Sequence, residues 1–380
     1  MINENNYFIS QTNPPLFHPT FGSRPARIVG RDQVLNTFIS GINEPVGSRS
    51  RCIFLIGHRG MGKTALLLEM TDLARHLNMV PALVTAYEGM NDDIIETIQR
   101  NGAEYAEKKN LPIHGFEVGA LGFSFGLTFN EVTQEHYGFR TKLTLLCDQL
   151  ALAGKGVLLL VDEVTNSESM RQLGITYQHL VGENKNIAIV MAGLPHSVSS
   201  VLNDKVLTFL NRAEKIRLGP INTADIRAYY RMAFEKEKIS ISDALLDLAA
   251  ASTDGYPYFM QLLGYYLMRY PSPDRQIDRH ALDEAVRLSR LDLEENVFSP
   301  ILLPLSRWDL LFLKAMAQDK KNSYMSEIGK RMKKKNSFLQ PYRARLISAG
   351  IIESPKKGVV SFTIPYLANY LRNMEDIALL

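Results

Sequence analysis

The sequence predicts an α/β protein, with a parallel sheet covered by helices on both faces and a helical region behind it. Three observations lead to this fold class. Apolar runs alternate with helical stretches through the first part of the chain. Each run is apolar throughout, as in strands that are buried on both faces of a sheet. Residues 222 to about 289 then have a helical pattern, and positive charge gathers towards the C-terminus.

The composition is that of an ordinary globular protein. Of the 380 residues, 46% are apolar and 22% are charged, which suits two or three domains with a large buried core. The two cysteines, Cys52 and Cys147, can form neither a disulfide framework nor a zinc site, which favours a reducing compartment. The first residues lack the pattern of a signal peptide, and no apolar run reaches the ~18 residues of a membrane span. We therefore expect a cytoplasmic protein with no membrane partner.

The most informative motif lies between a predicted strand and a predicted helix. Cys52–Ile56 is a short apolar run, and residues 65–70 begin a helix. Between them lie Gly57, His58, Arg59, Gly60, Met61, Gly62, Lys63 and Thr64. The spacing matches G-x-x-x-x-G-K-[ST], a loop whose backbone N–H groups surround the phosphates of a nucleotide. This predicts ATP or ADP bound by the loop and by Ala65 after it, with Lys63 on the β- and γ-phosphates and Thr64 on Mg²⁺.

The segments around this loop complete the first part of the predicted fold. Residues 1–25 are polar and rich in proline, which predicts an extended arm. An amphipathic helix follows over residues 33–42, with Asp32 as its cap. After the loop we expect a strand over residues 79–87 and a helix over residues 92–109.

An insertion near residues 112–130 interrupts the alternation. From Gly115 to Phe129, large apolar residues alternate with small ones, which is typical of a hairpin. It lies between two predicted helices, so we expect it to project from the main sheet. Two interpretations remain open. The insertion is either a hairpin packed on the body of the protein or a loop that contacts nucleic acid or a neighbouring subunit.

Two carboxylates follow a later strand. After a helix over residues 134–152, the apolar run that begins at Val157 ends in Asp162 and Glu163. In a phosphate-loop ATPase, an aspartate at such a strand end binds Mg²⁺, and a following glutamate deprotonates the attacking water. Another helix, a strand over residues 187–192 and a short strand over residues 215–218 complete a core that we assign to residues 26–220.

Four motifs together resemble the AAA+/STAND ATPases, nearest to the archaeal and bacterial ATPases related to origin-recognition initiators. They are the phosphate loop, Asp162-Glu163, Val29-Gly30-Arg31-Asp32, and Gly255-Tyr256-Pro257 in the helical region. The resemblance covers roughly residues 25–268. It implies a P-loop NTPase core and makes residues 221–300 a helical lid.

The resemblance also implies roles for further residues. It places Ile28, Val29 and Gly30 beside the adenine and ribose, and Pro257 beside the nucleotide. It makes Arg212 a candidate arginine finger, which would act on the nucleotide of a neighbouring subunit in a homo-oligomer. The alternative for Arg212 is a plain surface arginine or a salt-bridged one.

Two departures from the family pattern bear on hydrolysis. The strand over residues 187–192 is followed by Gly193-Leu194-Pro195, with no polar residue at the usual sensor position. Ser197 or His196 would have to replace it. The lid also lacks, after Gly255, the arginine that many related lids point at the γ-phosphate. Both departures favour a slow switch over a fast motor.

The last part of the chain predicts a basic winged helix over residues 301–373, followed by a tail over residues 374–380. The pattern gives helices over residues 306–318, 325–334 and 339–349, the second with Ser323 as a possible cap, and strands over 351–353 and 359–364. From Ser306 to Arg372 there are 14 Lys and Arg against 4 Asp and Glu, a local charge of +10 in a chain of net charge +3. The candidate contacts to DNA phosphates are Lys330, Arg331, Lys334, Arg343, Arg345, Lys356 and Lys357.

The sequence therefore predicts an ATP-binding, ATP-hydrolysing switch that binds DNA through its basic C-terminal domain, largely by phosphate contacts. The alternative is a nucleotide-gated signalling scaffold whose winged helix binds a protein partner. A housekeeping nucleotide kinase is disfavoured by the long helical extension and the C-terminal module.

Overall fold

The computed structural model describes residues 16–20, 24–107, 123–124, 128–129, 137–269, 271 and 274–374. Contacts divide the chain into two units. The helical unit consists of the described residues of Met1–Gly30 with Pro220–Val297. The sheet unit consists of the described residues of Arg31–Gly219 with those of Phe298–Leu380.

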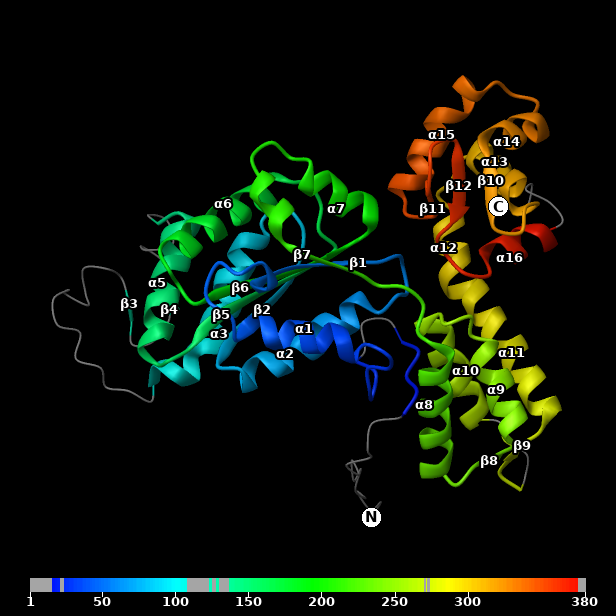
Figure 1. Ribbon diagram of the computed structural model, residues 1–380, viewed down its shortest axis with the longest axis horizontal. Coiled ribbons are helices and arrows are strands. Elements are labelled where there is room, and N and C mark those ends of the chain that lie inside the picture. The colour runs from blue at the N-terminus through cyan, green and yellow to red at the C-terminus, as the bar shows by residue number, and fades with distance from the viewer. Residues whose placement is uncertain are drawn as a thin grey trace, which may run out of the picture. The chain divides into compact units, whose positions relative to one another are not determined.

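A five-stranded parallel sheet forms the centre of the sheet unit. Its strands are β1 (Cys52–Ile56), β2 (Met79–Thr85), β5 (Gly156–Asp162), β6 (Ile187–Gly193) and β7 (Glu214–Arg217). They pair in the order β2-β5-β6-β1-β7, and every neighbouring pair is parallel. The chain therefore leaves β1 and passes over the positions of β6 and β5 before it forms β2 (Figure 1). This order puts the ends of β1 and β5 on either side of β6.

Helices cover both faces of this sheet, as strands without a polar face require. They are α1 (Asp32–Ile42), α2 (Lys63–His76), α3 (Met90–Glu107), α5 (Phe139–Leu152), α6 (Glu168–Gly182) and α7 (Pro195–Leu202). Buried side chains of α3, α5, α6 and α7 form one core with alternate residues of the strands. Helices α1 and α2 lie across the sheet from α6 and α7 (Figure 1). Phe54 and Leu55, which point to opposite faces of β1, are both fully buried.

Local backbone geometry corrects two predictions in this unit. Helix α1 begins at Asp32 itself, its N-cap is Arg31, and no side chain caps it, so the predicted Asp32 cap is wrong. Strand β5 ends at Asp162 because Glu163 has a φ of +53°, a left-handed conformation that cannot continue a strand.

In the predicted hairpin, β3 (Phe123–Ser124) and β4 (Thr128–Phe129) pair antiparallel, as a hairpin requires. The other residues of 112–130 lie outside the described residues.

Among the described residues, the helical unit is built around four α-helices. These are α8 (Thr223–Lys236), α9 (Asp243–Ala251), α10 (Pro257–Arg269) and α11 (Arg279–Leu293), with β8 (Ser240–Ile241) and β9 (Gln276–Ile277) paired parallel. Leu16 and Phe17 are buried among them. The Tyr229 hydroxyl donates to the Leu16 carbonyl at 2.6 Å, and the Phe17 ring meets the Tyr229 ring edge-on at 5.3 Å. The described end of the predicted polar arm is therefore anchored in the helical core.

The residues after 298 form a small α/β domain within the sheet unit. Its elements are α12 (Ser299–Leu302), α13 (Arg307–Ala317), β10 (Asn322–Tyr324), α14 (Met325–Met332), α15 (Asn336–Ser348), β11 (Ile352–Glu353), β12 (Val359–Phe362) and α16 (Leu367–Asn373). The strands form an antiparallel sheet in the order β10-β12-β11. The predicted Ser323 cap is wrong, because Ser323 lies in β10 and its hydroxyl donates to the Met316 carbonyl at 3.1 Å. The sequence pattern missed β10 and α16.

Both cysteines pack as small apolar groups. Cys52 and Cys147 are buried free thiols, and burial raises the pKa of each to about 12. Neither is therefore a reactive thiolate at neutral pH. Among the described helices, none has the length and apolar character that a membrane crossing requires.

Candidate functional site

The predicted phosphate motif forms a loop between β1 and α2. Gly60 and Gly62 have φ values of +74° and +83°, which residues with a side chain rarely adopt. A Cβ at Gly62 would meet no atom within 4 Å, so the loop is open at this point. The backbone N–H of Gly57 donates to the Gly193 carbonyl at 3.2 Å, which ties the loop to the end of β6. Helix α2 begins at Lys63, so its first N–H groups lack partners within the helix and can bind an anion.

The ammonium of Lys63 lies against the loop. It donates to the carbonyl oxygens of Gly57 and His58, at 2.9 and 3.0 Å. Burial lowers the pKa of Lys63, while the carboxylates of Asp162 and Glu163 act in the opposite direction. Because a partly buried charge is screened less than one in water, an incoming phosphate gains more from this ammonium than from a surface lysine.

The structure brings together residues that are 98 positions apart in the sequence. The Thr64 hydroxyl donates to Oδ2 of Asp162 at 2.6 Å. The backbone N–H of Glu163 donates to Oδ1 of the same carboxylate at 2.9 Å. Asp162 is buried and Glu163 is exposed. The left-handed backbone of Glu163 therefore ends the strand and fixes the Asp162 carboxylate beside Thr64.

Thr64 and Asp162 fit a magnesium ion. Hydroxyl and carboxylate oxygens are the ligands that Mg²⁺ prefers in proteins. The two oxygens already lie together beside the loop. Within the described residues, no group of three or more His, Cys, Asp or Glu side chains could hold a metal ion. A magnesium ion here would therefore take further ligands from a nucleotide and from water.

The position of the missing sensor residue is occupied by the start of α7. His196 and Ser197 lie there, with Nε2 of His196 3.2 Å from the Ser197 hydroxyl. Burial lowers the pKa of His196, and the positive charge of Arg59 in the phosphate loop lowers it further.

His58 makes a contact that no sequence signal indicates. Its Nε2 lies 3.2 Å from Oε2 of Glu353 in β11, and this contact lowers the pKa of the Glu353 carboxyl. Close packing accompanies it, because a Cβ at Gly350 would lie 2.7 Å from the Leu194 side chain. Within the sheet unit, the phosphate loop is therefore in contact with the C-terminal domain.

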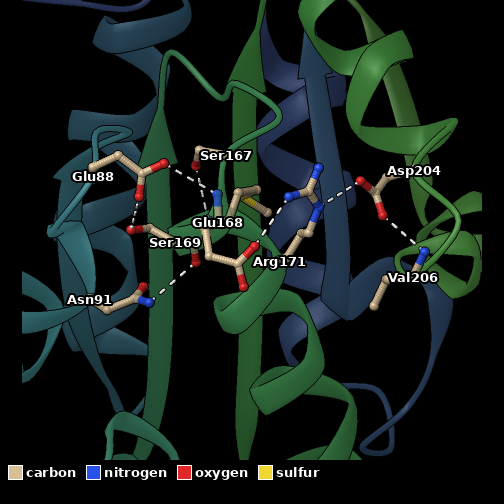
Figure 2. Close-up of polar contacts among 9 residues, drawn as sticks. Glu88, Asn91, Ser167, Glu168, Ser169, Arg171, Asp204 and Val206 are labelled. Carbon is tan, nitrogen blue, oxygen red and sulfur yellow. Dashed lines mark hydrogen bonds and ion pairs between the residues drawn. The ribbon is translucent and has the colours of Figure 1, made fainter.

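A second polar network holds the start of α6, just beyond Asp162 and Glu163 (Figure 2). Glu88 accepts a hydrogen bond from the backbone N–H of Glu168 at 3.2 Å and another from the Ser169 hydroxyl at 2.9 Å. Asn91 donates to the Ser169 carbonyl at 3.2 Å. The segment after β2 is therefore tied to the first turn of α6.

Arg171 extends this network towards Arg212. Its guanidinium donates to Asp204 at 2.8 Å, and Asp204 accepts a hydrogen bond from the backbone of Val206 at 2.9 Å (Figure 2). These contacts fix the segment that enters the short helix η2 (Thr208–Arg212). Arg212 itself is exposed and makes no hydrogen bond or ion pair with any described residue. Its guanidinium is therefore available to another molecule.

Val29, Gly30 and Pro257 belong to the helical unit. Gly30 has a φ of +63°, and a Cβ there would lie 2.7 Å from the Ile221 side chain. The N–H of Ile221 donates to the Gly255 carbonyl at 2.8 Å, and Gly255 has a φ of +70°. Pro257 begins α10, where its missing N–H leaves no bond unmade. Close packing on Ile221 explains why positions 30 and 255 are glycines. That Val29, Gly30 and Pro257 lie beside the nucleotide stays a prediction.

The cations expected to contact DNA fall into two groups, and two arginines form the first. Arg331 pairs with both oxygens of Asp319, at 2.6 and 2.7 Å. Arg345 likewise pairs with Asp309 at 2.8 Å, and Asp309 is only 1% exposed. These guanidiniums are engaged within their own domain, a role that the sequence did not indicate.

The second group consists of cations that are held less firmly by carboxylates of their own domain. Lys330, Lys334, Lys356 and Lys357 are exposed. Lys330 forms an exposed ion pair of the kind that contributes little to stability. The ammonium groups of Lys334 and Lys356 lie over aromatic rings. Arg343 is half-buried and donates to the Ser354 hydroxyl at 2.7 Å.

Solved structures match almost the whole chain. A Walker-type ATPase of Pyrococcus abyssi is 14% identical, with a TM-score of 0.65 over 95% of this chain and 99% of that one. The Aeropyrum pernix ORC2 protein, solved as ADPNP–ADP complexes, is 14% identical, with a TM-score of 0.60 over 93% and 94% of the two chains. Its ADP form is 13% identical, with a TM-score of 0.55 over 94% and 98%. The chain therefore shares its fold with these proteins, and its parallel sheet covered by helices is the α/β fold that the sequence predicts.

The C-terminal domain has a separate match. A family described as a domain of unknown function (DUF8462) matches residues 295–371. No curated protein matches the chain. The family match therefore delimits the domain without giving it a function.

Proposed function

We propose that this protein is a switch that binds and hydrolyses ATP and binds DNA through its C-terminal domain. The observation that carries the nucleotide part is the arrangement of Lys63, Thr64 and Asp162 at the open loop. The ammonium suits the phosphates of a triphosphate, and the hydroxyl and the carboxylate suit the metal ion bound to it. The fold shared with a Walker-type ATPase, and with an ORC2 protein solved with ADPNP and ADP, supports ATP and ADP as ligands.

In this proposal each residue of the loop region has a distinct task. The loop N–H groups and Lys63 hold the β- and γ-phosphates, because they present positive charge to them. Thr64 and Asp162 hold Mg²⁺, which offsets phosphate charge when bound. Glu163 accepts a proton from the attacking water. The water oxygen then bonds to the γ-phosphorus, and the bond to the ADP oxygen breaks, which releases ADP and phosphate.

Two further residues would assist hydrolysis. Arg212, exposed and unpaired among the described residues, would stabilise charge on the γ-phosphate of a neighbouring subunit in a homo-oligomer. His196 would take the place of the missing sensor. Burial lowers its pKa, which favours the neutral imidazole, a hydrogen-bond donor that adds no charge. Without the usual sensor and lid arginine, we propose slow hydrolysis.

We propose a winged helix for the C-terminal domain, supported by three helices that are followed by the antiparallel pair β11 and β12. The phosphate contacts would come from Lys330, Lys334, Lys356 and Lys357, with a smaller part for Arg343. Arg331 and Arg345 would contribute less, because their charges are paired with carboxylates. Contacts to phosphates position DNA without reading its sequence.

Phosphate release and duplex binding test the two halves of the proposal. The 380-residue protein with ATP and Mg²⁺ should release phosphate slowly. A labelled duplex should bind more weakly as salt rises, because each phosphate contact releases counterions. The duplex affinity should also differ between ATP and ADP if the nucleotide acts as a switch. Failure to bind ATP would overturn the nucleotide half, and failure to bind a duplex at low salt would overturn the DNA half.

A nucleotide-gated scaffold that binds a protein partner is the second candidate. The pairing of Arg331 and Arg345 with Asp319 and Asp309 favours it, since this removes two charges from the DNA surface. ATP binding without duplex binding at low salt would support the scaffold. We place either function in the cytoplasm, where reducing conditions suit buried free thiols.

A further inference from the structure

Three aromatic side chains gather at the surface of the C-terminal domain. Trp308 lies at the start of α13, and Phe338 and Tyr342 lie one turn apart on α15. The ring centres of Trp308 and Phe338 are 5.0 Å apart, and those of Phe338 and Tyr342 are 5.3 Å apart. We call these three residues the ring cluster. All three are half-buried, whereas the buried core of the domain contains Leu310, Phe312, Leu313, Met316, Leu339 and Leu346.

Two cations lie over these rings, and they are held in different ways. The Arg345 guanidinium lies 5.2 Å from the centre of the Tyr342 ring, and its pair with Asp309 fixes it there. The Lys334 ammonium lies 5.0 and 5.1 Å from the centres of Trp308 and Phe338. Among the described residues, no carboxylate pairs with Lys334. A cation over partly exposed rings is weakly held, so Lys334 can move to a stronger partner.

The surroundings of the ring cluster are positively charged. Lys333 and Lys335 flank Lys334 in the connection between α14 and α15, and Arg307 directly precedes Trp308. All of these cations are exposed. The neighbouring carboxylate of Asp309 is buried and is paired with an arginine. The patch therefore suits an anionic partner that also offers flat apolar faces.

Resting on the DNA-binding function proposed above, we propose that the ring cluster stacks the unpaired bases of single-stranded DNA. A duplex keeps the faces of its bases inside the stack, so aromatic rings add nothing to its phosphate contacts. An unpaired base exposes a π-face that stacks on an aromatic side chain. The planes of Trp308 and Phe338 lie at 77°, so a base can stack on one ring without separating the pair. Lys334 then moves from the ring face to the phosphate beside that base.

The fluorescence of Trp308 tests this proposal in the 380-residue protein, because Trp308 is the only tryptophan of this sequence. The probes are an oligothymidine of about 15 nucleotides, a duplex of the same length and a polyglutamate of similar charge. We expect the oligothymidine to quench Trp308 to saturation, and the other two probes to quench it much less when they are bound. Equal quenching by polyglutamate would show that the patch responds to charge alone and would overturn the proposal.

Variants separate stacking from charge. Trp308→Ala should weaken binding of labelled oligothymidine about tenfold, as expected for one lost stacking contact, with little change in duplex affinity. Tyr324→Ala is the matched control, since it removes an exposed ring near Lys356, outside the ring cluster. It should leave single-strand affinity unchanged. If Trp308→Ala fails to fold, Lys334→Gln keeps all three rings. It should weaken single-strand binding more than Lys320→Gln, which removes an exposed lysine between α13 and β10.

The outcomes distinguish this inference from the function on which it rests. If oligothymidine binds while Trp308 emission stays unchanged and Trp308→Ala binds equally well, the stacking site is wrong and the DNA-binding function stands. If neither a single strand nor a duplex binds at low salt, both are wrong.

Discussion

The phosphate loop and the C-terminal domain both gather charged groups, but they hold them differently. At the loop, Lys63 donates to backbone carbonyls, and Thr64 donates to Asp162. In the C-terminal domain, the guanidiniums of Arg331 and Arg345 are paired with carboxylates. The first arrangement leaves an ammonium for an incoming phosphate, whereas the second uses part of the domain's charge to hold the domain together.

This difference shows that a short motif is a better guide to a site than a total of charges. The glycines, the lysine and the threonine of the phosphate motif lie in one loop, so their spacing determines their geometry. The local charge of +10 in the C-terminal part says nothing about which cations are paired after folding. Substitutions in the phosphate loop and in the C-terminal domain test this difference.

Lys63→Ala should have the largest effect. Two charge-assisted hydrogen bonds to phosphate contribute about 4 kcal/mol together, so ATP affinity should fall about 1000-fold. Isothermal titration calorimetry measures the change, and Lys205→Ala, an exposed lysine of the same unit, serves as the control. A variant with wild-type affinity for ATP would show that the loop is not the nucleotide site.

Glu163→Gln should separate binding from hydrolysis at the same loop. Loss of the general base should slow phosphate release about 100-fold, while ATP affinity stays unchanged because the amide keeps the shape of the side chain. Phosphate release is measured under saturating ATP. Glu168→Gln, an exposed carboxylate at the start of α6, is the matched control. Unchanged release in Glu163→Gln would refute the role of the base.

Arg345→Ala tests the paired cations of the C-terminal domain. It leaves the buried Asp309 without its guanidinium partner, so the free energy of unfolding should fall by about 2 kcal/mol. Denaturant unfolding followed by Trp308 fluorescence reports on this domain. Lys357→Ala removes an exposed lysine and should leave stability unchanged. Equal stability of the two variants would contradict a structural role for the arginine.

Lys357→Ala should have the smallest effect, and on DNA alone. The loss of one phosphate contact should reduce the slope of log affinity against log salt by about 1 and weaken duplex binding only modestly. Fluorescence anisotropy over a series of salt concentrations measures this slope. A slope equal to that of the wild type would remove Lys357 from the DNA surface.

Features that depend on residues close together in the chain could be predicted from the sequence. The apolar runs place the strands of the main sheet, and the phosphate motif places Lys63 and Thr64 at the start of α2. Asp162 ends its strand, and Glu163 follows it in a left-handed conformation that the sequence did not indicate. Cap predictions at Asp32 and Ser323 were wrong, because a residue type that favours caps does not decide where a helix starts.

Contacts between residues far apart in the chain could not be predicted in this way. The strand order brings Oδ2 of Asp162 to 2.6 Å from the Thr64 hydroxyl. Folding also brings His58 into contact with Glu353, and Arg331 into contact with Asp319. Periodicity indicates which face of an element is buried, but not which element covers it. Hydrogen bonds and ion pairs act over a few ångströms, so their partners are set by the packing of the whole chain.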